Sequence, residues 1–231
     1  MNKQKSQYKF LGFLSMLYLV FFLSAAILAH KLVYFGHYMT SVSTFVLPFS
    51  FVLVDIIAEV YGYAVARKLI WSALVCEFVF ATIMLLAVHL NSPGVLNNTD
   101  AYKEVFGTFM RIFIGNFIAM VGASFFNIYI LVKWKFLLKG RYFWLRSLGS
   151  SGVGEFIFTF TCVLIAFVGV VPAASIPQLV VTSFLFKAIF NPIIVFPAAI
   201  FMNFLKKREG VDVYEYNINF SPFKLSSSKA E

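Results

Sequence analysis

The chain has 231 residues, of which 61% are hydrophobic, and its mean hydropathy is +0.85. Soluble domains contain about 45–50% apolar residues, so this composition excludes an ordinary water-soluble domain and indicates a membrane protein. The formal net charge is +9. Because the basic residues flank apolar stretches instead of forming one patch, we interpret the charge as an orientation signal and expect no nucleic acid partner.

Continuous apolar runs of helix length predict six transmembrane helices, and therefore an all-α integral membrane protein embedded in the lipid bilayer. A closed β-barrel would show short alternating segments instead. We expect the spans at about 10–33, 43–63, 69–90, 111–132, 151–171 and 179–205. This divides the chain into a six-helix transmembrane domain, residues 1–208, and a C-terminal tail, residues 209–231.

Lysine and arginine are distributed unevenly between the two sets of connecting segments. Positive residues accumulate in cytoplasmic loops, so the richer set should face the cytoplasm. Both termini belong to that set, and we therefore predict a multi-pass protein with both termini in the cytoplasm. The richer segments are residues 3–9, 67–68, 133–146 and 206–229, whereas the opposite side holds Lys31, Lys103 and Arg111.

Two acids four residues apart, Asp55 and Glu59, lie within the second predicted span. The spacing places them on one helix face, which Tyr63 continues. An ionisable group at the centre of a membrane helix costs about 2.5–3.5 kcal/mol, so both acids should face a cavity or a partner and not lipid. Neighbouring acids repel each other, so at least one needs a cation or a hydrogen-bond donor. They predict either a substrate site or a clamp between helices.

Other ionisable residues also fall in or near the spans. Lys187 lies about eight residues into the sixth span, too deep for its ammonium to reach the interface easily. We expect either a substrate contact or a carboxylate partner among Asp55, Glu59 and Glu155. Glu155 is preferred because the fifth and sixth spans are joined by a short loop and should be neighbours. For Glu77 we favour a structural contact between helices. For Arg111 we expect the long side chain to extend its guanidinium to the membrane interface.

Two further patterns concern the shape of the bundle. Pro48 in the second span, and Pro192 and Pro197 in the sixth, are expected to interrupt their helices. Six spans divide into three plus three, and an odd number gives the two halves opposite orientations. This is the geometry of inverted-repeat transporters, and the middle span of each predicted half carries an acid.

Several segments together resemble a known family. The segment FSFVLVDIIAEVYGYAVARKLIW is similar to the signature of the vitamin uptake transporter-like family, whose assigned members are queuosine precursor transporters. Matching pieces follow in order: RIFIGNFIA, LRSLGSSGVGE, FKAIFNPIIVFP and DVYEYNINFSPF. The resemblance implies a six-helix protein of the bacterial inner membrane that takes up 7-deazaguanines such as preQ0, preQ1 or queuine, which cells use for tRNA modification.

The resemblance also implies roles for individual residues. Asp55, Glu59, Tyr61 and Gly62 match the second-helix motif of the family, Arg111 its fourth-helix arginine and Lys187 its sixth-helix lysine. The chain departs from the family at Asn127 and Phe158, where members often carry acids. A carboxylate can accept the two parallel donors of a guanine-like edge, and an amide can meet its carbonyl. The predicted substrate-binding residues are Asp55, Glu59, Tyr63, Asn127, Glu155 and Lys187.

Two rival functions stay open on the residues alone. A membrane-embedded enzyme could use Asp55 and Glu59, but it would need a second acid cluster or a nucleophile at the same depth, and none is evident. A substrate-binding subunit of an ATP-driven importer would need a separate ATPase, because the chain has no P-loop motif. We expect no cofactor and no metal, since no Cys/His spacing suggests one. A homo-oligomer or an energising subunit stays open as a partner.

Overall fold

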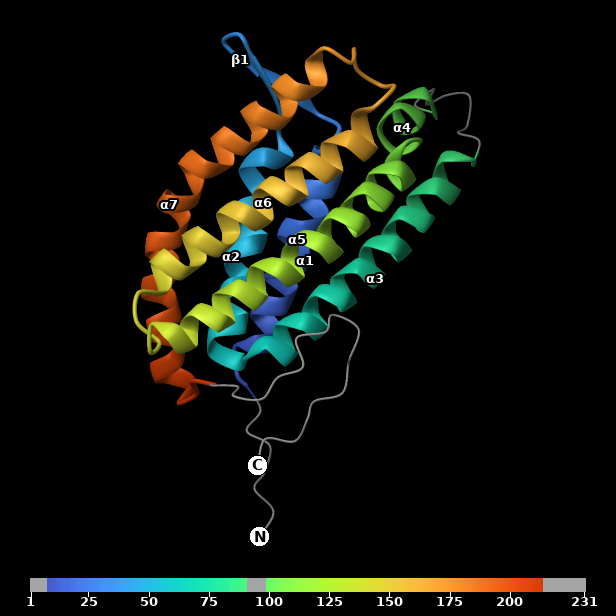
Figure 1. Cartoon of the computed structure of the whole chain (residues 1–231). Helices are drawn as coiled ribbons and strands as arrows, with labels where there is room; N and C mark the ends of the chain where they lie inside the picture. Colours follow the sequence, from blue (N-terminus) through green and yellow to red (C-terminus); the bar gives the residue numbers. More distant parts are fainter. Residues whose placement is uncertain (1–7, 91–98, 214–231) are drawn as a thin grey trace.

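The computed structural model describes residues 8–90 and 99–213. Within these residues, six long apolar helices have the length and composition to cross a membrane (Figure 1). The prediction of a helical membrane protein with six spans is therefore confirmed. The six helices are α1 (Leu11–Leu28), α2 (Ser43–Tyr61), α3 (Tyr63–Val88), α5 (Phe109–Leu137), α6 (Phe143–Phe167) and α7 (Ser175–Glu209).

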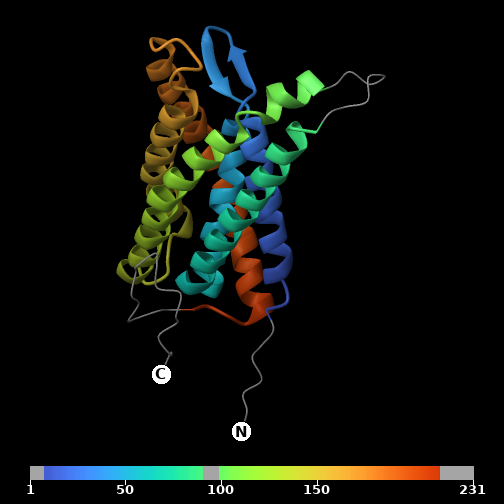
Figure 2. The same cartoon turned by 90° about the vertical axis from the view of Figure 1, so that its right-hand side faces the viewer.

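Two smaller elements were not predicted from the sequence. Strands β1 (Leu32–Phe35) and β2 (Tyr38–Ser41) pair as an antiparallel hairpin, and α4 (Thr99–Phe106) precedes α5. The apolar run of the first span continues into β1, so hydropathy alone extends the helix too far. Both elements lie at one end of the bundle, here called the hairpin end (Figures 1 and 2). The other end, where α1 begins and α7 ends, is called the terminal end.

The helix boundaries differ most from the prediction at the terminal end. Lys135 and Arg146, which were predicted in a connecting loop, lie within α5 and α6. A hydropathy pattern ends a span at the first charges, but helices continue where those charges find partners inside the protein. The chain also turns earlier than expected, at Gly62, whose φ of +94° suits glycine. Tyr63 therefore begins α3 instead of continuing the second span.

The prolines do not interrupt their helices, and this prediction is wrong. Helix α2 continues through Pro48, and α7 runs without a break through Pro192 and Pro197. A proline removes a single backbone hydrogen bond. In an apolar surrounding the other backbone groups have no water to bond, so they keep their helical partners on both sides of each proline.

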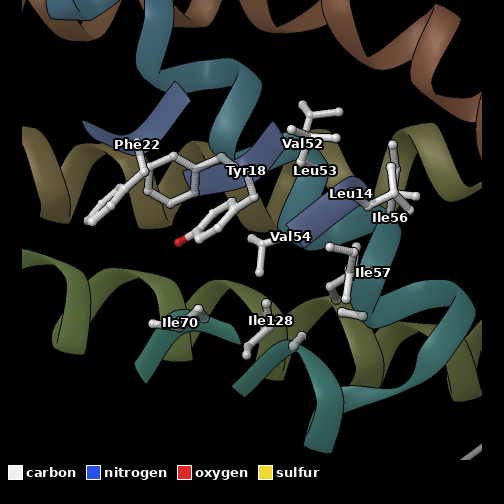
Figure 3. Close-up of a cluster of buried hydrophobic side chains, with 14 of the residues drawn as sticks. Leu14, Tyr18, Phe22, Val52, Leu53, Val54, Ile56, Ile57, Ile70 and Ile128 are labelled. Atoms are coloured by element: carbon white, nitrogen blue, oxygen red, sulfur yellow. The ribbon is translucent and has the colours of Figure 1, made fainter. Parts of the chain in front are cut away.

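Helix α2 lies inside the bundle, and every residue from Ser50 to Tyr61 is buried. Apolar side chains from α1, α2, α3 and α5 pack together there (Figure 3). Helix α6 approaches α5 closely at Gly154, where an added Cβ would lie 3.1 Å from the Cβ of Asn127. This close approach brings polar side chains of α5 and α6 next to α2.

The predicted division into a domain and a tail remains a prediction. Helix α7 ends at Glu209, and the next residues, 210–213, lie against the terminal end of the bundle. The remainder of the predicted tail, residues 214–231, lies outside the described residues. The inverted relation between the two halves likewise remains a prediction.

Six crossings place the residues before α1 and after α7 on the same side, and we predict that this side is cytoplasmic. A cysteine introduced at Ser6 should react with a membrane-impermeant maleimide only after cells are permeabilised, because the basic segments should stay inside. Tyr38→Cys, at the exposed tip of the hairpin, is the control and should react in intact cells. Labelling of the Ser6→Cys variant in intact cells would contradict this orientation.

Candidate functional site

A pocket lies near the hairpin end, between α1, α2, α5, α6 and α7. Its cavity volume is about 40 Å³. This is room for a few water molecules and is far below the roughly 300–1,000 Å³ of typical small-molecule sites, so the pocket is narrow in this state. Alanines of α1 and the ring of Phe158 supply apolar walls. The polar residues of its lining are Ser41, Ser43, Thr44, Asn116, Thr159, Ser183 and Lys187.

Hydroxyl groups on one side of the pocket bond to one another. The Oγ1 atom of Thr40 lies 3.0 Å from the Oγ1 of Thr44 and 3.0 Å from the Oγ of Ser183. These contacts join β2, α2 and α7. A hydroxyl can both donate and accept, so this side of the pocket can offer either kind of hydrogen bond to a ligand.

Lys187 lines the pocket, but its direct partner is not the predicted one. Its Nζ donates to the Oγ1 of Thr159 at 2.9 Å and lies 5.3 Å from the centroid of the Phe158 ring. No carboxylate lies within ion-pair distance of it among the described residues, although the charges of Lys187 and Glu155 still interact. Glu155 lies one turn before Thr159 on the same face of α6. The ammonium of Lys187 lies at the level of Thr159, so it does not pair directly with Glu155.

We expect the Lys187–Thr159 contact to appear as coupling between two substitutions. Thr159→Val should lower the stability of the detergent-solubilised protein by about 1–3 kcal/mol, because the buried ammonium loses its hydrogen-bond acceptor. In a Lys187→Met background the same change should cost much less. Thermal unfolding of the single and double variants measures this, with Thr82→Val on α3 as the matched control. Additive losses would show that the two side chains are not partners.

Asp55 lies deeper in the bundle and receives only neutral donors. Its Oδ2 accepts hydrogen bonds from Ser147 at 2.6 Å and Ser151 at 3.1 Å, and its Oδ1 accepts one from Asn127 at 2.7 Å. The side chain is fully buried. The structure thus brings two of the predicted residues, Asp55 and Asn127, into direct contact. The donors come from α5 and α6, so this carboxylate joins three helices.

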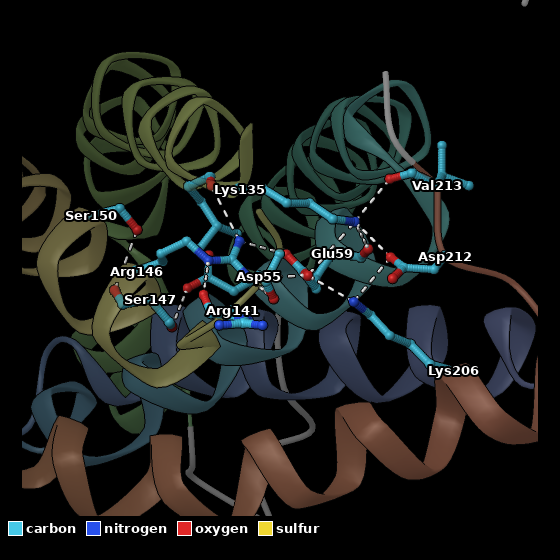
Figure 4. Close-up of polar contacts among 12 residues, drawn as sticks. Asp55, Glu59, Lys135, Arg141, Arg146, Ser147, Ser150, Lys206, Asp212 and Val213 are labelled. Atoms are coloured by element: carbon cyan, nitrogen blue, oxygen red, sulfur yellow. Dashed lines mark hydrogen bonds and ion pairs between the residues drawn. The ribbon is translucent and has the colours of Figure 1, made fainter. Parts of the chain in front are cut away.

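Glu59, one turn further along α2, has a different environment. Arg146 donates to both of its oxygens, at 2.8 Å and 3.1 Å, and Lys206 donates to Oε1 at 2.8 Å (Figure 4). The Nζ of Lys135 lies 3.6 Å from the same oxygen. Glu59 is 1% exposed and Arg146 is 0% exposed. The acids of α2 were expected to form either a substrate site or a clamp between helices. In this structure the contacts of Glu59 are those of a clamp between helices.

The segment after α7 joins the same group of charges. Lys135 donates to the Oδ1 of Asp212 at 2.7 Å and to the backbone oxygen of Val213 at 2.8 Å. Burial works to raise the pKa of Asp212, but hydrogen bonds from Lys135 and Lys206 outweigh it and hold that pKa below its usual value. Docking of this segment should therefore weaken as the pH falls through the lowered pKa. We call Glu59, Lys135, Arg146, Lys206 and Asp212 the terminal ion cluster.

Arg111 also has a partner inside the protein. Its guanidinium donates to the backbone oxygens of Ile165 and Val168 at the end of α6. Carbonyls at a helix C-terminus have no partner within the helix, and a cation there is favourable. Arg111 therefore stabilises the end of α6, and the expectation that it extends to the membrane interface stays a prediction.

The six predicted residues lie in several different environments, and their common role in substrate binding stays a prediction. Lys187 lines the pocket, Asp55 and Asn127 bond to each other deeper in the bundle, and Glu59 belongs to the terminal ion cluster. Glu155 is buried, and its Oε1 has no hydrogen-bond partner among the described residues. Tyr63 is buried at the start of α3, beside the guanidinium of Arg67.

Sequence reasoning missed most of the partners of the acids, including Arg146, Lys135 and the serines of α6. One signal was available. Ser147, Ser151, Glu155 and Thr159 recur at intervals of four, which places them along one face of a helix. That polar face would have predicted a fifth span starting earlier than residue 151. No signal of this kind indicates which acid each donor meets.

Comparisons with known proteins point to a family of transporters. A family described as "Putative vitamin uptake transporter" matches residues 41–202, which run from β2 into α7. A protein of Bacillus subtilis (strain 168), named "Probable queuosine precursor transporter", is 27% identical over 139 residues. That alignment covers 59% of this chain and 60% of the relative, which is less than two thirds of the relative's length. No solved structure gives a significant match.

Proposed function

The chain belongs to the vitamin uptake transporter family, and on this premise we propose that it imports a queuosine precursor, a 7-deazaguanine such as preQ0, preQ1 or queuine. The membrane would be a bacterial inner membrane, with both termini in the cytoplasm. The observation that carries the proposal is a narrow, partly polar pocket inside a bundle of apolar helices. The helices around it would have to move apart to admit a base. Membership of a transporter family favours carriage of this ligand over the enzymatic alternative.

The pocket offers the groups that a 7-deazaguanine requires. Such a base is a flat, aromatic bicycle with donors and acceptors along its edges. The ring of Phe158 supplies an aromatic face, while Thr44, Ser183 and Asn116 supply donors and acceptors. The ammonium of Lys187 can donate to the carbonyl oxygen of the base, since Thr159 uses only one of its hydrogens in the structure.

We place the acids at a second stage of transport. Asp55 of α2 and Glu155 of α6 are both buried, and their charges interact. When the bundle opens toward the terminal end, either carboxylate could accept the two parallel donors of the guanine-like edge. Asp55 would exchange its hydrogen bonds from Ser147 and Ser151 for those of the base. Opening would also require α2, α5, α6 and α7 to separate at the terminal ion cluster.

Uptake of radiolabelled base tests the proposed function. Cells that can neither make nor import queuosine precursors should accumulate queuine, preQ0 or preQ1 when they express the chain, and should then contain queuosine in their tRNA. The vector without the chain is the control. Competition among the three unlabelled bases ranks the substrates. If correctly inserted protein accumulates none of them above the control, the substrate class is wrong.

A further inference from the structure

Glu77 of α3 is a buried acid that the proposed transport function does not use. Its side chain is 0% exposed. Its Oε1 accepts one hydrogen bond, from the Nδ2 of Asn116 at 2.7 Å, and its Oε2 has no partner in the described part of the chain. Asp55 has three donors, and Glu59 is surrounded by cations. An ionised carboxylate at Glu77 would therefore be stabilised far less than either of the other two.

Among the described residues, no cation pairs with Glu77. The charge of Lys187 interacts with Cys162 and Glu155. The titratable side chains that interact with it are Tyr18 of α1 and Cys162 of α6, and both are neutral while protonated. The packed face of α5 contributes the amide of Asn116. The two acids of α2 are bonded to their own partners, as described above. The environment thus favours a carboxyl group that can take up a proton.

Asn116 connects this carboxyl group to the pocket. It lines the pocket together with Cys162, whose thiol donates to the Oδ1 of Asn116 at 3.2 Å. The same amide donates to Glu77 from its other end. A ligand that draws the Asn116 amide toward the pocket would therefore weaken the one hydrogen bond that ionised Glu77 accepts within residues 8–90 and 99–213.

We propose that Glu77 is a proton-binding site that couples uptake to a proton gradient, with Asn116 as the link to the pocket; this rests on the proposed transport function. The carboxylate takes a proton from the solution on the outer side when substrate engages Asn116, and it releases that proton on the inner side when substrate leaves. Because each event favours the other, proton and substrate travel in the same direction. Glu77→Gln should mimic the protonated carboxyl permanently and remove the coupling.

Reconstituted protein tests the coupling directly. In proteoliposomes held at zero membrane potential, one proton per substrate should raise the accumulation of labelled base about tenfold for each pH unit of inwardly directed gradient. Glu77→Gln should lose this dependence on the gradient, whereas Glu77→Asp should keep part of it. Glu104→Gln, at an exposed position of α4, should behave like the wild type. A Glu77→Gln protein whose uptake follows the gradient as the wild type does would overturn the proposal.

Infrared spectroscopy of the purified protein tests proton binding by Glu77 without any substrate. The difference between the spectra at acid and alkaline pH should contain, for the wild type, a band from the protonated carboxyl group of Glu77. This band should be missing from the difference spectrum of Glu77→Gln but present in that of Glu104→Gln. Identical difference spectra for the wild type and Glu77→Gln would show that Glu77 takes up no proton. The proposal would then fail even if the chain transports a 7-deazaguanine. A wild type that shows the band but carries no base would refute the transport function alone.

Discussion

Replacing Glu59 with leucine should sharply reduce the yield of monodisperse protein extracted from membranes. In the part of the chain that the structure describes, Glu59 is the carboxylate that Arg146 contacts, so the substitution leaves a guanidinium that is 0% exposed without this anion. Removing one partner of a buried ion pair typically costs about 3–5 kcal/mol. Since folded proteins are stable by only about 5–15 kcal/mol, this is one of the largest effects a single substitution can have here.

A set of variants separates this explanation from a general packing defect. Arg146→Met in the Glu59→Leu background should recover much of the yield, because the stranded charge is then removed. Arg141→Met, which replaces an exposed arginine just before the same helix, is the matched control and should not recover it. Size-exclusion profiles of detergent-solubilised protein give the measurement. If the double variant yields less than Glu59→Leu, the two side chains do not stabilise each other.

Asp55→Asn should reduce uptake of the transported base by at least about tenfold while leaving membrane insertion intact. The carboxylate now accepts from Ser147, Ser151 and Asn127, and an amide would point an NH2 group at one or more of these donors. Hydrogen bonds to a charged group contribute about 1.5–3 kcal/mol, which corresponds to a tenfold or larger effect. The amide also cannot accept two parallel donors from a guanine-like edge.

The control for this experiment is Asp100→Asn, the same change at an exposed position of α4. Labelled uptake is normalised to the amount of each variant in the membrane fraction, so that a loss of protein is not counted as a loss of transport. Normal uptake by well-expressed Asp55→Asn would contradict a role for this carboxylate in transport.

The membrane class and the helix count followed from the sequence because they depend on composition over long windows. A helix can cross a lipid core because its backbone groups form hydrogen bonds within the helix. Runs of about 20 apolar residues predict such helices regardless of how they pack. Individual residues were also informative. The depth of Asp55 and Lys187 along their spans was enough to predict that neither faces lipid, and both are buried in the structure.

The partners of those residues depended on the tertiary structure. Asp55 and Glu59 lie on one face of α2, so their spacing predicts a common environment. Yet one turn of helix moves the side chain by about 5.4 Å along the axis, which is enough to change the neighbouring layer of α5 and α6. Asp55 meets neutral donors there, whereas Glu59 meets Arg146, Lys135 and Lys206.

The relative positions of the helices also explain why the partners of Lys187 and of the predicted loop charges differ from the prediction. The sequence by itself determined that a buried ammonium needs a partner, but only the relative height of α6 and α7 decided that Thr159, and not Glu155, lies at its Nζ. Likewise, hydropathy places Arg146 outside the membrane span, while the structure buries it against Glu59. Composition and periodicity act along one chain, whereas the contact between two charges depends on the register between helices that are distant in sequence. That register is set by side-chain packing across the whole bundle.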